Sequence, residues 1–223
     1  MNIYMIFEKN NFIQGNFKQN SAQTISKIQH LYNIEDDQIT RLKEFVDMII
    51  EHNSNYNFIG KSTINDIWHR HILDSIQIIK LIDNNDHKFA DFGSGCGLPG
   101  IVLSIAGLKE IYLIEKSYRK SEFLKIAKHL SQNRIYVQQS KIEELKNIKF
   151  NCILSRALAP LPKLLNYCME FLDENGYCLF LKGKKLDEEI TNCKNIFKFD
   201  FQKFQSITSK QSNIIKITNI KKL

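Results

Sequence analysis

Lys88-Phe89-Ala90-Asp91-Phe92-Gly93-Ser94-Gly95-Cys96-Gly97-Leu98-Pro99-Gly100 is the stretch that decides the fold of this chain. An apolar run stops at Asp91, four glycines follow within eight residues, and a segment compatible with a helix begins at Pro99. Glycine is needed where the backbone takes a positive φ or lies against a ligand. Proline fits the first helical turn, and the amides there offer donors to a polar or anionic ligand. The stretch therefore predicts the strand, tight turn and helix start of a nucleotide-type cofactor site.

Three interpretations of this turn are open. Gly95-x-Gly97-x-x-Gly100 fits the fingerprint of a dinucleotide site. Gly93-x-Gly95-x-Gly97 fits the methyltransferase turn that packs under the amino-acid part of S-adenosylmethionine. A tight turn without a ligand is the third interpretation, and four glycines at this spacing disfavour it.

An acidic residue follows the next apolar run. Ile111-Tyr112-Leu113-Ile114 predicts a strand, and Glu115 stands at its end, 22 residues after Gly93. A carboxylate there accepts hydrogen bonds from both hydroxyls of a ribose. Since either cofactor carries a ribose, Glu115 favours a nucleoside ligand over a solvated strand end without deciding which.

Length and composition narrow the class of protein. The 223 residues suffice for one α/β domain and a small N-terminal helical part. No apolar run has the length of a membrane span, and the polar start has no signal-peptide hydrophobic region. The five cysteines show no CxxC spacing. They predict buried, reduced thiols in a cytoplasmic protein, with no metal site.

The positive charge lies in the second part of the chain. Residues 1–87 hold 8 Lys and Arg against 11 Asp and Glu, a net charge of −3, whereas residues 88–223 hold 23 against 13, a net charge of +10. A basic catalytic domain favours a polyanionic substrate such as nucleic acid. Lysine enrichment from an AT-rich genome is the alternative.

The pattern before residue 88 is helical. Residues 1–20 predict a loose extension and residues 21–33 a short helix. Apolar residues on one face predict helices from Asp36 to Asn53 and from Ser62 or Thr63 to about Leu81. Residues 21–87 are therefore expected to form an N-terminal helical region.

From Lys88 onward strands and helices alternate. We expect strands at 88–92, 111–115, 135–139, 151–155 and 177–182, and helices at 99–106, 118–131, 160–172 and 185–196. Two consecutive strands, 197–207 and 213–220, end the chain. Such a hairpin suits a methyltransferase sheet, whose last strand is antiparallel, better than a dinucleotide-binding half. The expected core is Phe89, Phe92, Ile101, Leu103, Leu113, Ile114, Leu124, Val137, Ile153, Leu154, Leu165, Leu179 and Leu181.

Several segments in this order resemble one known family. They are Asn57-Phe58-Ile59-Gly60, Trp68-His69-Arg70-His71-Ile72-Leu73-Asp74-Ser75, the glycine turn through Ile101, Gln139-Ser140-Lys141-Ile142-Glu143-Glu144, Ser155-Arg156-Ala157 and Leu181-Lys182-Gly183. Together they resemble the bacterial small-subunit ribosomal RNA guanine-N7 methyltransferase family, RsmG, also called glucose-inhibited division protein B (GidB). The resemblance covers about residues 36–220.

The resemblance implies a fold and an activity. The fold would be α/β, with a Rossmann-like class I methyltransferase sheet, an antiparallel C-terminal hairpin and S-adenosylmethionine bound by residues 88–223. The activity would be methylation of N7 of one guanine in 16S rRNA. The expected partner is 16S rRNA or the small ribosomal subunit, and a cytoplasmic monomer without metal or membrane is expected.

The resemblance also assigns residues. Gly93 and Leu98 would line the cofactor, and Ile142 and Glu143 would flank its adenine, partly through backbone groups. The full set expected to bind the cofactor is Gly93, Ser94, Gly95, Gly97, Leu98, Glu115, Ile142, Glu143 and Arg156. Two departures bear on substrate contacts: Lys141 stands where many relatives have Arg, and Tyr118-Arg119-Lys120 replaces a common Gly-Lys-Arg.

Arg156 is the expected catalytic residue. It lies at the carboxyl end of a predicted strand, where ligands bind in open α/β sheets. It could pair with the cofactor carboxylate, an rRNA phosphate or guanine O6, and an ordinary salt bridge is the alternative. Because guanine N7 has a free lone pair and no proton, the reaction requires no general base.

A second cluster falls on one or two helical turns: Arg70, His71, Asp74 and Ser75. His71 would be a proton carrier on a catalytic interpretation. We favour a structural hydrogen-bonded cluster that docks the N-terminal helices onto the cofactor turn, because this chemistry has no proton to carry.

A third group of candidate site residues consists of cations near the predicted cofactor site. Lys182, Lys184 and Lys185 follow the fifth strand, and Arg119 and Lys120 begin the second crossover helix. They predict either a phosphate-contacting rim, with RNA binding that weakens steeply with salt, or a solvated basic face.

Three other functions remain open from the residues alone: an NAD-dependent oxidoreductase, a non-catalytic RNA-binding module and a methyltransferase of a small molecule.

Overall fold

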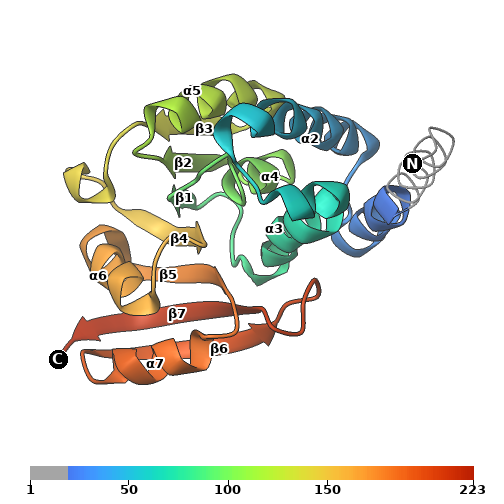
Figure 1. Ribbon diagram of the computed structural model, residues 1–223. Coiled ribbons are helices and arrows are strands. Elements are labelled where there is room, and N and C mark those ends of the chain that lie inside the picture. Colours follow the sequence, from blue (N-terminus) through green and yellow to red (C-terminus); the bar gives the residue numbers. More distant parts are fainter. Residues whose placement is uncertain (1–19) are drawn as a thin grey trace, which may run out of the picture.

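The computed structural model describes residues 20–223. Seven strands form one sheet in the order β3-β2-β1-β4-β5-β7-β6 (Figure 1). They are β1 Lys88–Phe92, β2 Glu110–Ile114, β3 Arg134–Gln138, β4 Phe150–Arg156, β5 Leu172–Lys182, β6 Phe197–Gln205 and β7 Asn213–Lys222. Strands β1 to β5 are parallel, and β7 is antiparallel to β5 and β6. The predicted Rossmann-like sheet with an antiparallel C-terminal hairpin is confirmed.

Helices cover both faces of the sheet (Figure 1). One layer holds α2 Asp36–Tyr56, α3 Asp74–Ile76, α4 Gly100–Ile105 and α5 Tyr118–Ala127, and the other holds α6 Leu161–Phe171 and α7 Leu186–Lys194. Because successive side chains of a strand point to opposite faces, Phe89 packs in the first layer and Ala90 in the second. The N-terminal helices share one hydrophobic cluster with the sheet, so they are fixed relative to the glycine turn.

The predicted core is buried except for one residue. Val137 is only partly buried, and its expected burial was wrong. It lies on β3, one of the two edge strands of the sheet. This strand has a neighbouring strand on one side only.

The helix predicted from Ser62 or Thr63 to about Leu81 is confirmed as one continuous helical segment that begins at Lys61, but it is not a regular α-helix. A 3₁₀ turn (Lys61–Asp66), a π-helix (Trp68–Leu73), α3 and a second 3₁₀ turn (Gln77–Leu81) follow one another. Polar groups of this segment bond to distant strands and loops: the Arg70 carbonyl accepts from Arg156, and Gln77 Oε1 accepts from a backbone N–H 130 residues away. These tertiary contacts accompany the changes of hydrogen-bond register within the helix, and π-helical turns are frequent at functional sites.

Other boundaries move by a few residues. Residues 20–32 are helical, close to the predicted 21–33, while the predicted loose extension lies outside the described residues except for its last residue. β5 begins at Leu172 rather than 177, and α5 ends at Ala127 and continues as a 3₁₀ turn, Lys128–Leu130. Within residues 20–223 no helix has the length and apolarity that a membrane crossing requires.

Candidate active site

The glycine turn connects β1 to α4 at the carboxyl edge of the sheet. Gly97 has φ of +94°, and a Cβ there would lie 2.7 Å from Ile101. A Cβ on Gly100 would lie 2.7 Å from Asp91 Oδ2, which accepts the Gly100 N–H at 3.0 Å. A side chain at either position would break the close packing of the turn, which explains why glycine stands there.

The carboxylate of Asp91 lies beneath this turn. It is fully buried, and its Oδ1 has no hydrogen-bond partner among residues 20–223. Burial raises the pKa of Asp91 to about 7, against the opposing effect of the Gly100 hydrogen bond. The residue was not among those predicted for the site, although it ends the apolar run from which the prediction began.

A cavity of about 430 Å³ opens beside the turn, and we call it the glycine-turn cavity. Five predicted cofactor residues line it: Gly93, Gly95, Glu115, Ile142 and Glu143. Lys120, predicted to contact RNA, lines it too. Sequence reasoning missed Ser140, Leu158, Lys163 and Tyr167, which also contribute to the wall.

Three other predicted cofactor residues belong to the turn itself: Ser94, Gly97 and Leu98. Ser94 is buried, and its hydroxyl donates to the Asp91 carbonyl at 2.8 Å. Leu98 is buried in the hydrophobic core. Neither side chain lines the glycine-turn cavity, and Gly97 does not line it either.

Glu115 ties the turn to the end of β2. Its Oε2 accepts the Gly95 N–H at 3.0 Å and its Oε1 accepts the Ser117 N–H at 2.8 Å. A carboxylate has about four lone-pair positions, so each oxygen retains acceptor capacity toward the cavity. The residue is held where two neighbouring hydroxyls could bind.

Glu143 lines the glycine-turn cavity. The Tyr167 hydroxyl donates to its Oε1 at 2.6 Å, and this hydrogen bond lowers the pKa of Glu143. Ile142 beside it is buried and presents an apolar surface. Lys163 and Tyr167 are four residues apart on α6 and therefore share a face, a spacing visible in the sequence once the helix is placed.

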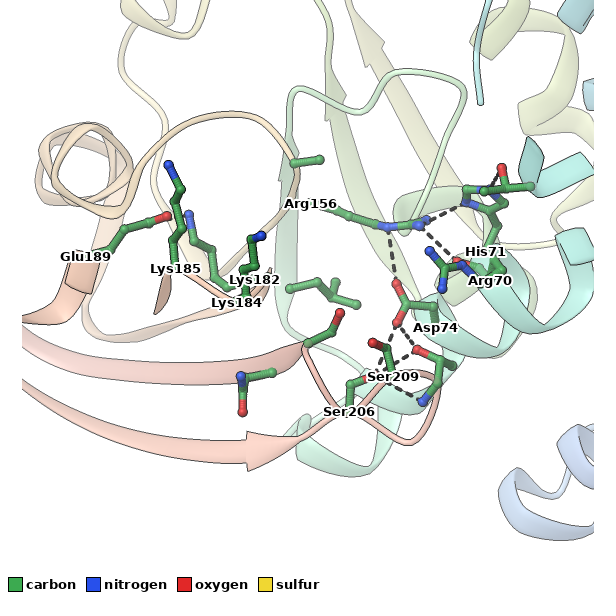
Figure 2. A pocket seen from close by; sticks show the side chains of 17 residues that line it. Arg70, His71, Asp74, Arg156, Lys182, Lys184, Lys185, Glu189, Ser206 and Ser209 are labelled. Carbon is green, nitrogen blue, oxygen red and sulfur yellow. Dashed lines mark hydrogen bonds and ion pairs between the residues drawn. The ribbon is translucent and has the colours of Figure 1, made fainter. Parts of the chain in front are cut away.

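A second cavity of about 450 Å³ lies on the other side of the β4 end, and we call it the Arg156 cavity (Figure 2). Arg70, His71 and Asp74 line it on one side, and Lys182, Lys184 and Lys185 on the other. Ala157 lines both cavities. The two spaces are therefore neighbours across the loop that follows β4.

Arg156 is held by three acceptors of the N-terminal region. Its Nη2 donates to the Arg70 carbonyl at 3.0 Å and to His71 Nδ1 at 2.9 Å, and its Nε lies 3.2 Å from Asp74 Oδ2. Its Nη1 has no hydrogen-bond partner among residues 20–223. Arg156 lines its own cavity and not the glycine-turn cavity.

His71 is a neutral positioning group. A guanidinium only donates, so Nδ1 of His71 accepts and its proton is on Nε2, which lies 2.8 Å from Thr63 Oγ1. Burial, followed by the charges of Arg156 and Arg70, lowers the pKa of His71 from 6.5 to about 3. The contacts therefore have the form expected of a structural cluster.

The predicted RNA-contacting cations fall into distinct environments. The Lys182 ammonium is 2.6 Å from Glu189 Oε2 and donates to the Ala159 carbonyl, so it holds the loop before α6. Lys184 and Lys185 are exposed at the Arg156 cavity. Arg119 is exposed on α5 and lines neither cavity.

Among the described residues, no group of three or more His, Cys, Asp or Glu side chains is arranged to hold a metal ion.

The sheet order, glycine turn and nucleoside-type cavity define a class I S-adenosylmethionine-dependent methyltransferase. A ribosomal protein L11 methylase from Lactobacillus delbrueckii subsp. bulgaricus shares the fold with a TM-score of 0.55 at 20% identity, over 66% of this chain and 76% of that one. The glycopeptide N-methyltransferase MtfA, solved with S-adenosylhomocysteine, gives 0.53 at 9% identity, over 66% and 88%.

Sequence comparison identifies the family within this class. The family model described as rRNA small subunit methyltransferase G (GidB) matches residues 38–218. The ribosomal RNA small subunit methyltransferase G of Orientia tsutsugamushi (strain Boryong) is 39% identical over 186 residues, 83% of this chain and 93% of the relative. The chain belongs to this family, as the resemblance predicted, and its cofactor is S-adenosylmethionine. The comparisons give no support to an NAD-dependent oxidoreductase or a non-catalytic RNA module.

Proposed function

We propose that this chain transfers the methyl group of S-adenosylmethionine to N7 of one guanine in 16S rRNA, with the guanine in the Arg156 cavity. The observation that carries the proposal is the pair of cavities that meet at Ala157. Because Ala157 lines both cavities, a cofactor in one and a base in the other would lie next to each other beside this residue. This is the arrangement that direct transfer between two bound molecules requires.

The glycine-turn cavity fits the cofactor. Glu115 offers two carboxylate oxygens to the ribose hydroxyls, and Ile142 offers an apolar flank to the adenine. Ser140 lines the same cavity, and its buried Oγ has no partner among the described residues. When bound, S-adenosylmethionine supplies a methyl group on a positively charged sulfur.

The residues of the Arg156 cavity orient the base rather than move a proton. Guanine N7 attacks with its lone pair and loses no proton, so no general base is needed. Arginine donates to O6 and N7 when it recognises guanine. Among residues 20–223, Nη1 is the only guanidinium nitrogen of Arg156 without a hydrogen-bond partner, and a bond from it to O6 would leave N7 open to the methyl group. Alignment and electrostatics then supply the rate enhancement.

The RNA backbone would follow the exposed cations at the rim of the Arg156 cavity. Arg70, Lys184 and Lys185 line this cavity and form no ion pair with another described residue. They would contact phosphates, whereas Lys182 would act through the loop that it holds. We expect the chain to work as a monomer in the cytoplasm.

Ligand-dependent stability tests the cofactor assignment. A ligand that binds only the folded state raises the free energy of unfolding by about 2.7 kcal/mol at about 100 times its Kd. We expect S-adenosylmethionine and S-adenosylhomocysteine to raise the melting temperature and NAD to leave it unchanged. A shift with NAD alone would overturn the assignment.

A further inference from the structure

We propose that Thr208, on the loop between β6 and β7, is a positioning residue for methyl transfer, because it fixes Asp74 and thereby the guanidinium of Arg156. The inference rests on the proposed function, in which Arg156 orients the guanine. The sequence showed no sign of this role, since Thr208 and Asp74 are 134 residues apart. The C-terminal hairpin thus contributes to the site from outside the parallel part of the sheet.

The contacts of Thr208 form one directed chain. Its Oγ1 donates to Asp74 Oδ1 at 2.6 Å. Because a carboxylate only accepts, the hydroxyl proton of Thr208 is committed to Asp74. Ser206 Oγ, 2.8 Å from Thr208 Oγ1, then donates to Thr208. Hydrogen bonds in such a series strengthen one another in a buried site.

Asp74 connects this chain to Arg156. The carboxylate is buried, with its Oδ1 toward the hairpin loop and its Oδ2 at 3.2 Å from Arg156 Nε (Figure 2). Gln77 Nε2 also donates to Oδ1, at 2.9 Å. Ser206 Oγ lies farther from Oδ1, at 3.4 Å. Without the Thr208 hydroxyl, Oδ1 would lose its shortest hydrogen bond, and the carboxylate could rotate away from the plane of the guanidinium.

Rotation of Asp74 matters because one guanidinium nitrogen of Arg156, Nη1, has no partner in the described part of the chain and can bind a ligand. The contacts of Nε and Nη2 set the plane of the guanidinium, and this plane sets the direction of Nη1. A displacement of about 1 Å in a positioning contact reduces a rate by about 10²-fold. Thr208 would therefore affect the orientation of the base more than the affinity for the cofactor.

The loop itself does not depend on the Thr208 hydroxyl. The Ile207 N–H donates to Gln77 Oε1 at 3.0 Å, and Gln205 Nε2 donates to the carbonyls of Ser209 and Ser212 at 3.0 and 2.8 Å. These bonds remain when the hydroxyl is removed. A substitution at Thr208 can therefore separate positioning from loop stability.

The test compares Thr208→Val, which keeps the shape and removes the hydroxyl, with Thr208→Ser, which keeps the hydroxyl. Thr40→Val is the matched control, because Thr40 is exposed on α2 and its hydroxyl donates to the Asp36 carbonyl within its own helix. We expect kcat for methyl transfer to fall about 10- to 100-fold in Thr208→Val. The kcat of Thr208→Ser and of Thr40→Val should stay within about threefold of the wild-type value. The wild type and the three variants should bind S-adenosylhomocysteine with equal affinity.

A second readout does not require methyl transfer. The chain has five arginines, so the Nε–H resonance of Arg156 can be assigned by its loss in Arg156→Lys. We expect Thr208→Val to speed hydrogen exchange of this Nε–H at least about tenfold, while Thr208→Ser leaves it protected. Unchanged exchange in Thr208→Val, or full activity of that variant, would overturn the positioning role. Failure of the wild type to methylate rRNA would instead count against the proposed function.

Discussion

Replacing Glu115 with alanine should weaken cofactor binding far more than any other carboxylate change in the glycine-turn cavity. Each Glu115 oxygen accepts one backbone N–H, and each has a remaining lone pair for a ribose hydroxyl. A hydrogen bond to a charged group contributes about 1.5–3 kcal/mol, so two of them contribute about 3–6 kcal/mol. At about 1.4 kcal/mol per factor of ten, the Kd for S-adenosylhomocysteine should rise about 10²- to 10⁴-fold.

Isothermal titration calorimetry measures this Kd directly, and Glu143→Ala provides the matched control. Glu143 lines the same cavity and carries the same charge, but its carboxylate is exposed and accepts a hydrogen bond from Tyr167. Its expected contact with the adenine is partly through the backbone, which alanine retains. We expect its removal to change the Kd by less than about tenfold. Urea unfolding at saturating ligand checks that Glu115→Ala remains folded. Equal effects of the two substitutions, or no effect of Glu115→Ala, would refute the ribose assignment.

Three further predictions concern the Arg156 cavity. Arg156→Lys keeps a charge but loses the planar fork, so kcat should fall about 10²-fold with the Kd for S-adenosylhomocysteine unchanged; a parallel loss of cofactor affinity would place Arg156 on the cofactor. Lys184→Gln with Lys185→Gln should reduce the slope of log K for rRNA against log salt by about 1.4–1.8, and an unchanged slope would remove the phosphate contacts. His71 has a pKa of about 3 when folded and 6.5 in its ordinary state. The unfolded chain therefore binds more protons between these values, and the free energy of unfolding should fall as pH drops from 6.5 toward 3. Denaturant titrations at several pH values should show that His71→Gln lacks this component, and identical pH profiles would contradict the low pKa.

Short-range patterns in the sequence were sufficient to predict the central part of the fold. The glycines at 93, 95, 97 and 100 and the apolar runs around them are short-range features, because turn geometry and strand alternation depend on neighbouring residues. Glu115 could be placed for the same reason, since it follows a strand directly. The alternation of strands and helices then predicted that the cofactor site would lie at the carboxyl edge of the sheet.

Contacts between distant residues could not be predicted in the same way. Periodicity predicted the helix at 62–81 but not its 3₁₀ and π turns, which occur where Arg70 and Gln77 form hydrogen bonds to β4 and to the hairpin loop. From the sequence, Lys182 was expected to be a surface cation that contacts phosphate or solvent. In the structure it forms an ion pair with Glu189, a residue on the following helix. The role inferred for Thr208 depends on tertiary packing that a single sequence does not show.

The most direct measurement of the central claim is the position of the transferred methyl group. The purified chain would be incubated with isotope-labelled S-adenosylmethionine and small ribosomal subunits that lack the modification. Nuclease digestion and mass spectrometry would then identify the methylated nucleoside. We expect one labelled N7-methylguanosine in 16S rRNA, and little or none with Arg156→Lys. Label on an exocyclic amine, on a ribose or on another base, or no transfer at all, would contradict it.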